Sequence, residues 1–342
     1  NFRNQTDYKR QKAWYNEPKR ADREMSVKKR VYRGKTVRKN EEMRCTMKGR
    51  MLFIFNPRSG KGQIRNKLMD IIDVFVKGGY EVVVHPTQGA KDAEKMAKSM
   101  AEEVDLIVCS GGDGTLDEVV TGLMEIGANV PLGYIPAGST NDFASSLAIP
   151  RDMVKAAQDI VDGHLFSVDV GSFNEDNFIY VAAFGMFTDV SYETSQDLKN
   201  ILGHLAYVME GAKRIFDVKT YHLCVEANGE VHEGDYIYGM ITNSHSIGGF
   251  RNLVGNDVEM DDGLFEVTLI KKPKNPLELN EIIAALINAY DDTDMIDAFK
   301  ANSLYIHGDE AISWTLDGEF GGEHKEVRIK NRKQALDILI NS

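Results

Sequence analysis

The residues best suited to do chemistry form a glycine-rich segment, SGGDGT, at positions 110–115. An apolar run at 104–109 precedes this segment and an apolar helical pattern at 116–124 follows it, so it joins a buried strand to a helix. Glycines let the backbone approach a phosphate closely, and the free N–H groups at a helix start attract anions. The segment therefore predicts a phosphate-binding loop.

Two further glycine-containing loops follow predicted strands of the same sheet. NPRSGKG occupies positions 56–62, and PAGSTND occupies positions 136–142. Each of these loops alone is typical of an ordinary turn. In an open α/β sheet, however, ligands bind outside the carboxyl ends of the strands, where all three loops should meet. Together the loops favour a nucleotide site.

The common nucleotide and metal motifs are absent from the sequence. A dinucleotide fingerprint would need glycine at Asp117, and a Walker A loop would need glycine at Phe55 and a hydroxyl residue at Gly62. The 8 histidines form no HExxH pattern, and the 3 cysteines form no CxxC pair. Neither a disulfide framework nor a zinc site is supported by these spacings, which fits a reducing, cytoplasmic compartment.

The first half of the chain beyond residue 50 alternates apolar strand patterns with helical ones. We expect strands at 51–55, 81–85, 104–109 and 132–135, and helices at 64–75, 90–103 and 116–124. This alternation predicts an α/β domain with a parallel sheet and helices on both of its faces.

After about residue 169 the pattern changes to strands joined by loops. They are expected at 178–184, 219–227, 231–242, 264–270, 303–307, 311–316 and 325–330, with helical stretches near 195–215 and 275–300. This predicts a mainly antiparallel β domain. We therefore divide the chain into an arm (1–50), a nucleotide-binding domain (51–168) and a β-rich lipid-substrate domain (169–324), and residues 325–342 could return to the first domain.

Charge is distributed unevenly along the chain. Residues 1–50 hold 17 Lys+Arg against 6 Asp+Glu, whereas the remainder holds 24 against 46. The first segment predicts a flexible basic arm, which could bind anionic lipid or could be an extension without function. The longest apolar run, at 178–187, is too short to cross a bilayer, so any membrane contact should be peripheral.

Five motifs in order resemble the diacylglycerol kinase catalytic-domain family, which is related to sphingosine and ceramide kinases. They are NPRSGKG (56–62), GGDGTLDE (111–118), PAGSTNDFA (136–144), VEMDDGLFEV (258–267) and LDGEFGG (316–322). The resemblance covers nearly all of residues 51–342. It implies a nucleotide-binding α/β domain and a β-rich domain, with the active site in the cleft between them.

The resemblance also implies roles for individual residues. ATP would be contacted by Asn56, Pro57, Arg58, Ser59, Gly60 and Thr87, and its phosphates by Gly112, Asp113, Gly114, Thr115, Leu116, Asp117 and Glu118. Ser139 stands where the family usually has threonine, and it keeps the hydroxyl. Asp113 would engage catalytic magnesium, and Glu319 would be the general base toward a lipid hydroxyl, with Asp317 as the next candidate.

A second, structural magnesium site is implied at Glu259, Asp262 and the backbone carbonyl of Leu264, linked to the cleft by Asp169 through water. An EF-hand loop is excluded because its sixth position would be Asp262, and glycine comes one residue later. Without the resemblance, a solvated acidic turn is an equally good interpretation of this stretch.

The resulting hypothesis is an ATP-dependent lipid kinase that uses ATP and Mg²⁺, with diacylglycerol as the leading substrate and phosphatidic acid as product. It would act at the inner membrane face, with no nucleic-acid partner, and a homodimer is left open. Residues 185–215 could form a lip that admits an acyl chain or a helix packed on the β domain. The rivals are a NAD kinase-like enzyme, which shares GGDGT, and a non-catalytic nucleotide-binding regulator.

Overall fold

The computed structural model describes residues 47–185, 218–245, 258–287 and 293–341, within a compact unit that spans Cys45–Ser342. Most of the predicted basic arm, the helix expected near 195–215 and almost all of the proposed acyl lip lie outside the described residues. Among the helices that are described, none is long and apolar enough to cross a membrane.

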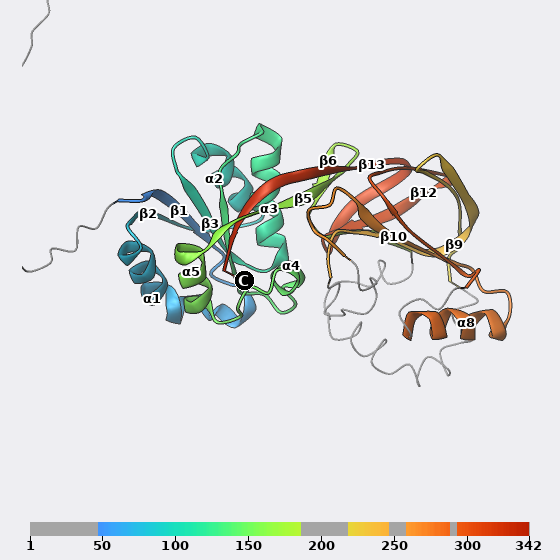
Figure 1. The fold of residues 1–342 in the computed structure, drawn as a ribbon, viewed down its shortest axis with the longest axis horizontal. Helices are drawn as coiled ribbons and strands as arrows, with labels where there is room; N and C mark the ends of the chain where they lie inside the picture. Colours follow the sequence, from blue (N-terminus) through green and yellow to red (C-terminus); the bar gives the residue numbers. More distant parts are fainter. Residues whose placement is uncertain (1–46, 186–217, 246–257, 288–292, 342) are drawn as a thin grey trace, which may run out of the picture. The chain divides into compact units, whose positions relative to one another are not determined.

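The first lobe is built on four parallel strands in the order β4-β3-β1-β2 (Figure 1). The strands are β1 Gly49–Phe55, β2 Tyr80–Pro86, β3 Leu106–Gly111 and β4 Leu132–Pro136. The helices are α1 Ile64–Lys77, α2 Asp92–Met100, α3 Asp113–Ile126, α4 Asp142–Ser146 and α5 Met153–Asp162. Helices α1 and α5 pack on one face of the sheet, and α2 and α3 pack on the other.

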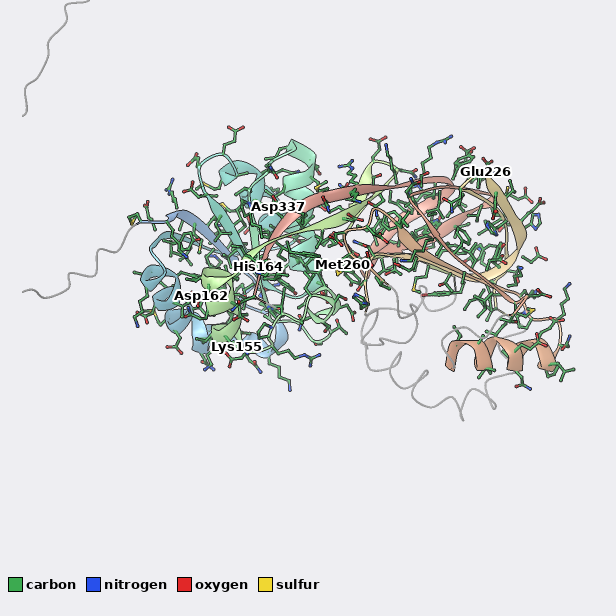
Figure 2. The ribbon with its side chains drawn as sticks, viewed as in Figure 1. Lys155, Asp162, His164, Glu226, Met260 and Asp337 are labelled. Carbon is green, nitrogen blue, oxygen red and sulfur yellow. The ribbon has the colours of Figure 1, made fainter. Side chains whose placement is uncertain are left out.

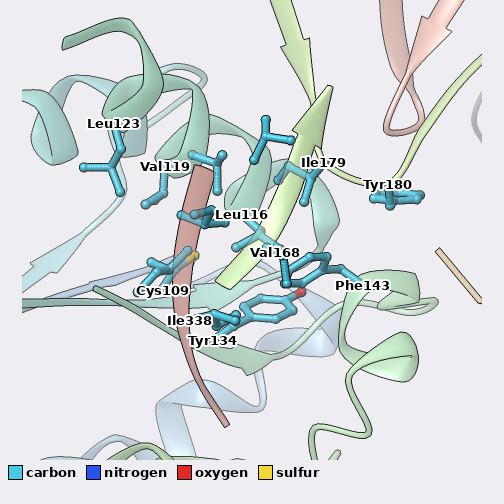
Figure 3. Close-up of a cluster of buried hydrophobic side chains, with 14 of the residues drawn as sticks. Cys109, Leu116, Val119, Leu123, Tyr134, Phe143, Val168, Ile179, Tyr180 and Ile338 are labelled. Carbon is cyan, nitrogen blue, oxygen red and sulfur yellow. The ribbon is translucent and has the colours of Figure 1, made fainter. Parts of the chain in front are cut away.

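The apolar run of β1 explains why both faces of this sheet are covered. Met51 and Phe53 point to the core under α1 and α5, whereas Leu52 and Ile54 belong to the cluster under α2 and α3. Successive side chains of a strand alternate between faces, so a strand buried on both sides must be apolar at every position. Figure 3 shows part of the second cluster, in which the C-terminal Ile338 packs near Tyr134.

The strands of the second lobe pair antiparallel, and the described part of this lobe also contains one helix. Its elements are β6 Asp176–Phe178, β7 Val181–Gly185, β8 Tyr221–Ala227, β9 Glu230–Thr242, β10 Phe265–Lys271, α8 Pro276–Ile287, β11 Ile296–Ala301 and β12 Ser303–Leu316. At the centre of its core, the Trp314 ring lies 5.0 Å from that of Phe173 and 4.8 Å from that of Phe184. This packing of large aromatic rings stabilises the lobe.

The helix predicted over 275–300 is wrong in its last part. Helix α8 ends at Ile287, and Ile296–Ala301 forms the strand β11, which pairs antiparallel with β10. The ladder satisfies those backbone groups of this segment that face β10, and Ile296 and Ala301 are buried. Pairing with a distant strand has overridden the local helical preference of its alanine and lysine residues.

Two long strands connect the lobes. β5 His164–Phe173 and β13 Glu319–Ile340 pair antiparallel, and β13 also pairs with β12, with which it forms a hairpin. Near its end β13 reaches the parallel sheet, where Ile338 pairs with Leu132 of β4. The β12–β13 turn at Asp317 and Gly318 therefore places Glu319 at the beginning of a strand that is anchored in both lobes.

Candidate active site

The three glycine-containing loops meet at the carboxyl ends of β1, β3 and β4. A Cβ atom added to Gly60, whose φ is +47°, would lie 1.8 Å from the carbonyl oxygen of Ala137. One added to Gly138 would lie 2.7 Å from the Cα of Gly112, and one added to Gly112 would lie 3.6 Å from Ser59 Oγ. Gly60 and Gly138 are thus required because the loops touch backbone to backbone there, whereas a Cβ on Gly112 would make only ordinary contacts.

The second loop leads directly into helix α3. Gly112 precedes the helix in an extended conformation, and its carbonyl accepts hydrogen bonds from the N–H groups of Thr115 and Leu116. Asn56 of the first loop donates to Thr115 Oγ1 over 3.4 Å. The first turn of a helix leaves N–H groups without helical acceptors, so this junction can receive a phosphate.

An open cleft of about 590 Å³ extends from these loops to the β12–β13 hairpin. It is lined by Asn56, Ser59, Ala90, Lys91, Glu94, Gly112, Gly114, Thr115, Asp117, Glu118, Thr121, Asp176, Asn177, Leu316, Glu319, Phe320 and Gly321. Residues from both lobes therefore share one cavity. Of the residues predicted to contact ATP and its phosphates, the following are not among its lining: Pro57, Arg58, Gly60, Thr87, Asp113, Leu116 and Ser139.

Asp113 provides a carboxylate oxygen that is available to a cation. Its Oδ2 accepts a hydrogen bond from Thr140 Oγ1 at 3.2 Å, while its buried Oδ1 has no hydrogen-bond partner among the described residues. Burial, followed by the nearby carboxylate of Asp142, raises the pKa of Asp113 to about 6. A bound divalent cation would satisfy Oδ1 and favour the ionised form, so this residue fits the magnesium role that the sequence suggested.

Glu319 faces the phosphate loop across the cleft. Its Oε1 lies 3.2 Å from the position that a Cβ on Gly114 would take, and the residue is exposed. A carboxylate in this place can accept a proton from an acceptor hydroxyl that lies next to a bound phosphate.

The cleft contains several carboxyl groups that lie close to one another. Burial is the main cause that raises the pKa of Asp117 to about 8, and four neighbouring carboxylates add to the shift: Asp317, Glu319, Glu118 and Asp176. Carboxylates gathered this closely repel one another unless a proton or a metal ion neutralises them. The cleft therefore suits a nucleotide bound together with a divalent cation better than a free anion.

Asp317, the alternative base, links the β12–β13 turn to the backbone of residues 179–181. Its carboxylate accepts three backbone hydrogen bonds, from Ile179 at 2.5 Å and from Tyr180 and Val181 at 2.9 Å each. The side chain is buried, and Asp317 adopts a φ of +49° in the hairpin turn. With its lone pairs occupied, Asp317 positions the turn that carries Glu319 and is a poor candidate for the base.

Two of the predicted phosphate-loop residues have structural contacts. The Glu118 carboxylate accepts hydrogen bonds from the backbone N–H groups of Lys91 and Ala93 at 2.8 and 3.1 Å, so it caps the start of α2. The Leu116 side chain is fully buried in the core (Figure 3). Only its backbone could contact a phosphate.

Several cleft residues were not proposed as site residues from the sequence. Leu316, Phe320 and Gly321 lie within the motif LDGEFGG, whereas no motif contains Ala90, Lys91, Glu94, Thr121, Asp176 and Asn177. Lys91, with a φ of +61°, is a cation beside the loops, and Phe320 is an aromatic residue next to Glu319 that is 68% exposed. Position along the chain could not identify the residues outside the motif, because the folding of α2, α3 and β6 brings them to the cavity.

The side-chain ammonium group of Lys300 lies beside the predicted second magnesium site. Asp262 Oδ1 accepts a hydrogen bond from the N–H of Leu264 at 2.8 Å, Oδ2 lies 3.4 Å from Lys300 Nζ, and Glu259 is exposed. Asp169 holds the turn directly, through Gly263 N at 2.7 Å and Gln334 N at 2.7 Å. A magnesium ion at Asp262 would thus compete with Lys300, and occupancy of this site stays a prediction.

Comparison with known proteins supports the fold and the family. Residues 50–173 match the model described as diacylglycerol kinase catalytic domain, and residues 182–340 match the YegS C-terminal NAD kinase beta sandwich-like domain. A diacylglycerol kinase of Bacillus subtilis (strain 168) is 35% identical over 275 residues, covering 80% of this chain and 90% of the relative. The chain belongs to the diacylglycerol kinase catalytic-domain family.

Other relatives of this family agree. A diacylglycerol kinase of Staphylococcus aureus (strain MRSA252) is 36% identical over 295 residues, covering 86% of this chain and 93% of the relative. A solved structure from Bacillus anthracis str. Sterne is 26% identical, with a TM-score of 0.73 over 86% of this chain and 99% of that one. The predicted fold class, an α/β domain followed by a mainly antiparallel β domain, is confirmed.

Membership in this family also confirms the predicted reaction class. The chain is an ATP-dependent lipid kinase, a phosphotransferase with an alcohol acceptor. The NAD kinase-like and non-catalytic alternatives are not favoured by these relatives.

Proposed function

We propose that this lipid kinase transfers the γ-phosphate of ATP to the free hydroxyl of diacylglycerol, forming phosphatidic acid at a membrane surface. The observation that carries the proposal is the pairing of Glu319 with the phosphate loop: its Oε1 lies 3.2 Å from the Cβ position of Gly114. A base in contact with the loop that would bind the phosphates is the arrangement that phosphoryl transfer to a hydroxyl requires.

Residues of the first lobe would bind and orient the nucleotide. The N–H groups at the start of α3 and the loop residues Asn56, Ser59 and Gly112 would hold the phosphates. Asp113 and Asp117 would hold a divalent cation, for which magnesium is our choice because it prefers oxygen ligands. When bound, the cation neutralises charge on the phosphates.

Proton transfer falls to Glu319. A Glu319 carboxylate oxygen would accept the hydroxyl proton as the lipid oxygen forms its bond to the γ-phosphorus, while the bond from that phosphorus to the bridging oxygen breaks and ADP leaves. The product is then a phosphomonoester, and the proton stays on Glu319 until solvent removes it. Asp317 keeps Glu319 in place through its three bonds to the backbone of 179–181.

An amphiphilic acceptor fits the rim of the cleft. Phe320 follows the base directly, lines the cavity and is 68% exposed, so an apolar ring stands beside the proton acceptor. An acceptor with a hydroxyl at one end and acyl chains at the other could place the hydroxyl at Glu319 and its apolar part along Phe320. The named relatives are diacylglycerol kinases, which supports this choice of lipid.

The test is a transfer assay with radiolabelled ATP over a panel of lipids in mixed micelles. The panel should contain diacylglycerol, monoacylglycerol, sphingosine and ceramide, with NAD and a sample without lipid as controls. We expect label in phosphatidic acid at the highest rate. Preferential labelling of a sphingoid base would reassign the substrate, labelling of NAD would restore the NAD kinase alternative, and nucleotide binding without any labelled product would restore the regulator.

A further inference from the structure

A row of possible metal ligands crosses the outer face of the β-rich lobe, away from the cleft lining. Cys224 of β8 pairs with His307 of β12, and on its other side Cys224 pairs with Glu233 of β9. His307 in turn pairs with Glu326 of β13. Four neighbouring strands thus contribute a carboxylate, a thiol, an imidazole and a second carboxylate at one level.

Three ligand atoms of this region are already close together. The ligand atoms of Cys224, Glu226 and His307 all lie within 4.8 Å of one another, and His307 Nε2 is 3.8 Å from Glu226 Oε1. The ligands of a tetrahedral zinc ion stand roughly 3.5 Å apart, given bonds of about 2.0–2.3 Å. Small side-chain rotations would therefore bring these atoms around one ion.

The orientation of these side chains is fixed by the sheet. Leu223 and Val225, the neighbours of Cys224 in β8, are fully buried in the lobe's core, so Cys224 and Glu226 must point to the opposite face. Figure 2 labels Glu226, whose side chain is exposed to solvent. An ion could reach the group without any change in the backbone.

We propose that Cys224, Glu226 and His307 form a binding site for a zinc-class divalent cation, distinct from the magnesium role of the cleft. A thiolate and an imidazole favour zinc over magnesium, which takes oxygen ligands. The fourth position falls to Glu326 or to water, because Glu233 already lies 3.5 Å from His222 Nε2. By joining β8 to β12, the ion would stabilise the outer sheet of this lobe.

Carboxylates surround the thiol. Glu226 lies two residues further along β8, and Glu233 pairs with Cys224 from β9. Their negative charge favours a divalent cation at this place, and a bound cation would displace the thiol proton.

The experiment is a titration of the full chain with Co²⁺ alone, without nucleotide or lipid, followed by displacement with Zn²⁺. Thiolate coordination gives a near-ultraviolet charge-transfer absorption, and we expect it to saturate at one ion per chain. Cys224→Ser should abolish the band. His307→Ala should weaken Zn²⁺ binding by at least about tenfold, since even the loss of an outer partner of a metal ligand costs that much.

The matched control is His222→Ala, a histidine on the same face of β8 whose Nδ1 lies 2.9 Å from Asp235 Oδ1. It should leave the band and the affinity unchanged. Circular dichroism of each variant would verify that the sheet is intact. Absence of the band in the natural chain, its persistence in Cys224→Ser, or an affinity in His307→Ala equal to that of His222→Ala would overturn the proposal.

Discussion

Replacing the proposed base, Glu319→Gln, separates proton transfer from nucleotide binding. Glutamine keeps the shape and the hydrogen-bonding capacity of the side chain but has no basicity at the carboxyl position. Glu319 lies on the β-rich side of the cleft, against Gly114, whereas Asn56, Ser59 and Gly112 surround the expected phosphates. ATP affinity should therefore change little.

The expected loss of turnover equals the contribution of a general base, which the substitution removes. A positioned general base contributes on the order of 10²–10⁴-fold, which is about 3–5 kcal/mol in the activation barrier at 1.36 kcal/mol per tenfold. Glu319 is exposed, so its replacement should not alter the core or the free energy of unfolding. We expect kcat to fall by that factor while KM for ATP stays within about threefold.

Calorimetric ATP binding and lipid turnover should be measured on the same preparation. The matched control is Glu323→Gln, an exposed glutamate of the same strand that does not line the cleft, and its turnover should equal that of the unaltered chain. A fall in turnover smaller than about tenfold would refute the base assignment. A collapse of ATP affinity would instead assign Glu319 to the metal–nucleotide site.

The other predictions concern four acidic residues. Asp113→Asn should abolish transfer with an unchanged circular dichroism spectrum, and turnover within a few-fold of the unaltered chain would contradict the cation role. Because the pKa of Asp117 is raised to about 8, the folded state binds its proton more tightly, so without divalent cations stability should fall as pH rises from about 4 to 8. Asp117→Asn should flatten this slope in thermal melts, and an equal slope would contradict it. Asp317→Ala should lower the free energy of unfolding by at least about 3 kcal/mol, since three N–H groups lose their acceptor at about 1 kcal/mol or more each; an unchanged urea midpoint would disagree. If magnesium binds at Asp262, then Asp262→Ala should lose magnesium-dependent stabilisation and Lys300→Met should enhance it. Equal stabilisation of the unaltered chain and both variants would mean that the segment around Asp262 is only an acidic turn.

The sequence alone predicted that three glycine-containing loops meet at one edge of a sheet. Glycines at 60 and 138 mark places where backbone must approach backbone, and their positions after apolar strand patterns are local features of the chain. The parallel sheet followed for the same reason, because Met51 through Phe55 can be apolar at every position only if both faces are covered. Glu319 was accessible only through the likeness of LDGEFGG to a known family.

Tertiary structure decided which carboxylates are available for chemistry. Glu118 and Asp317 belong to the same motifs as Asp113 and Glu319, yet the former pair accept backbone hydrogen bonds from residues 25 and 138 positions away. No local pattern encodes such a contact, because it depends on where α2 and the segment around Ile179 are brought by the fold.

Dependence on long-range contacts also explains why the sequence did not predict the strand β11 or the row that contains Cys224 and His307. Strand pairing joins residues that are far apart in the sequence, and it determines both which segment becomes a strand and which side chains stand side by side. Spacing along the chain gave no zinc pattern, since the thiol and the imidazole are neighbours only across the β8–β12 ladder. Local composition thus determined where this protein brings its glycine-containing loops together, and long-range pairing determined which side chains face each other.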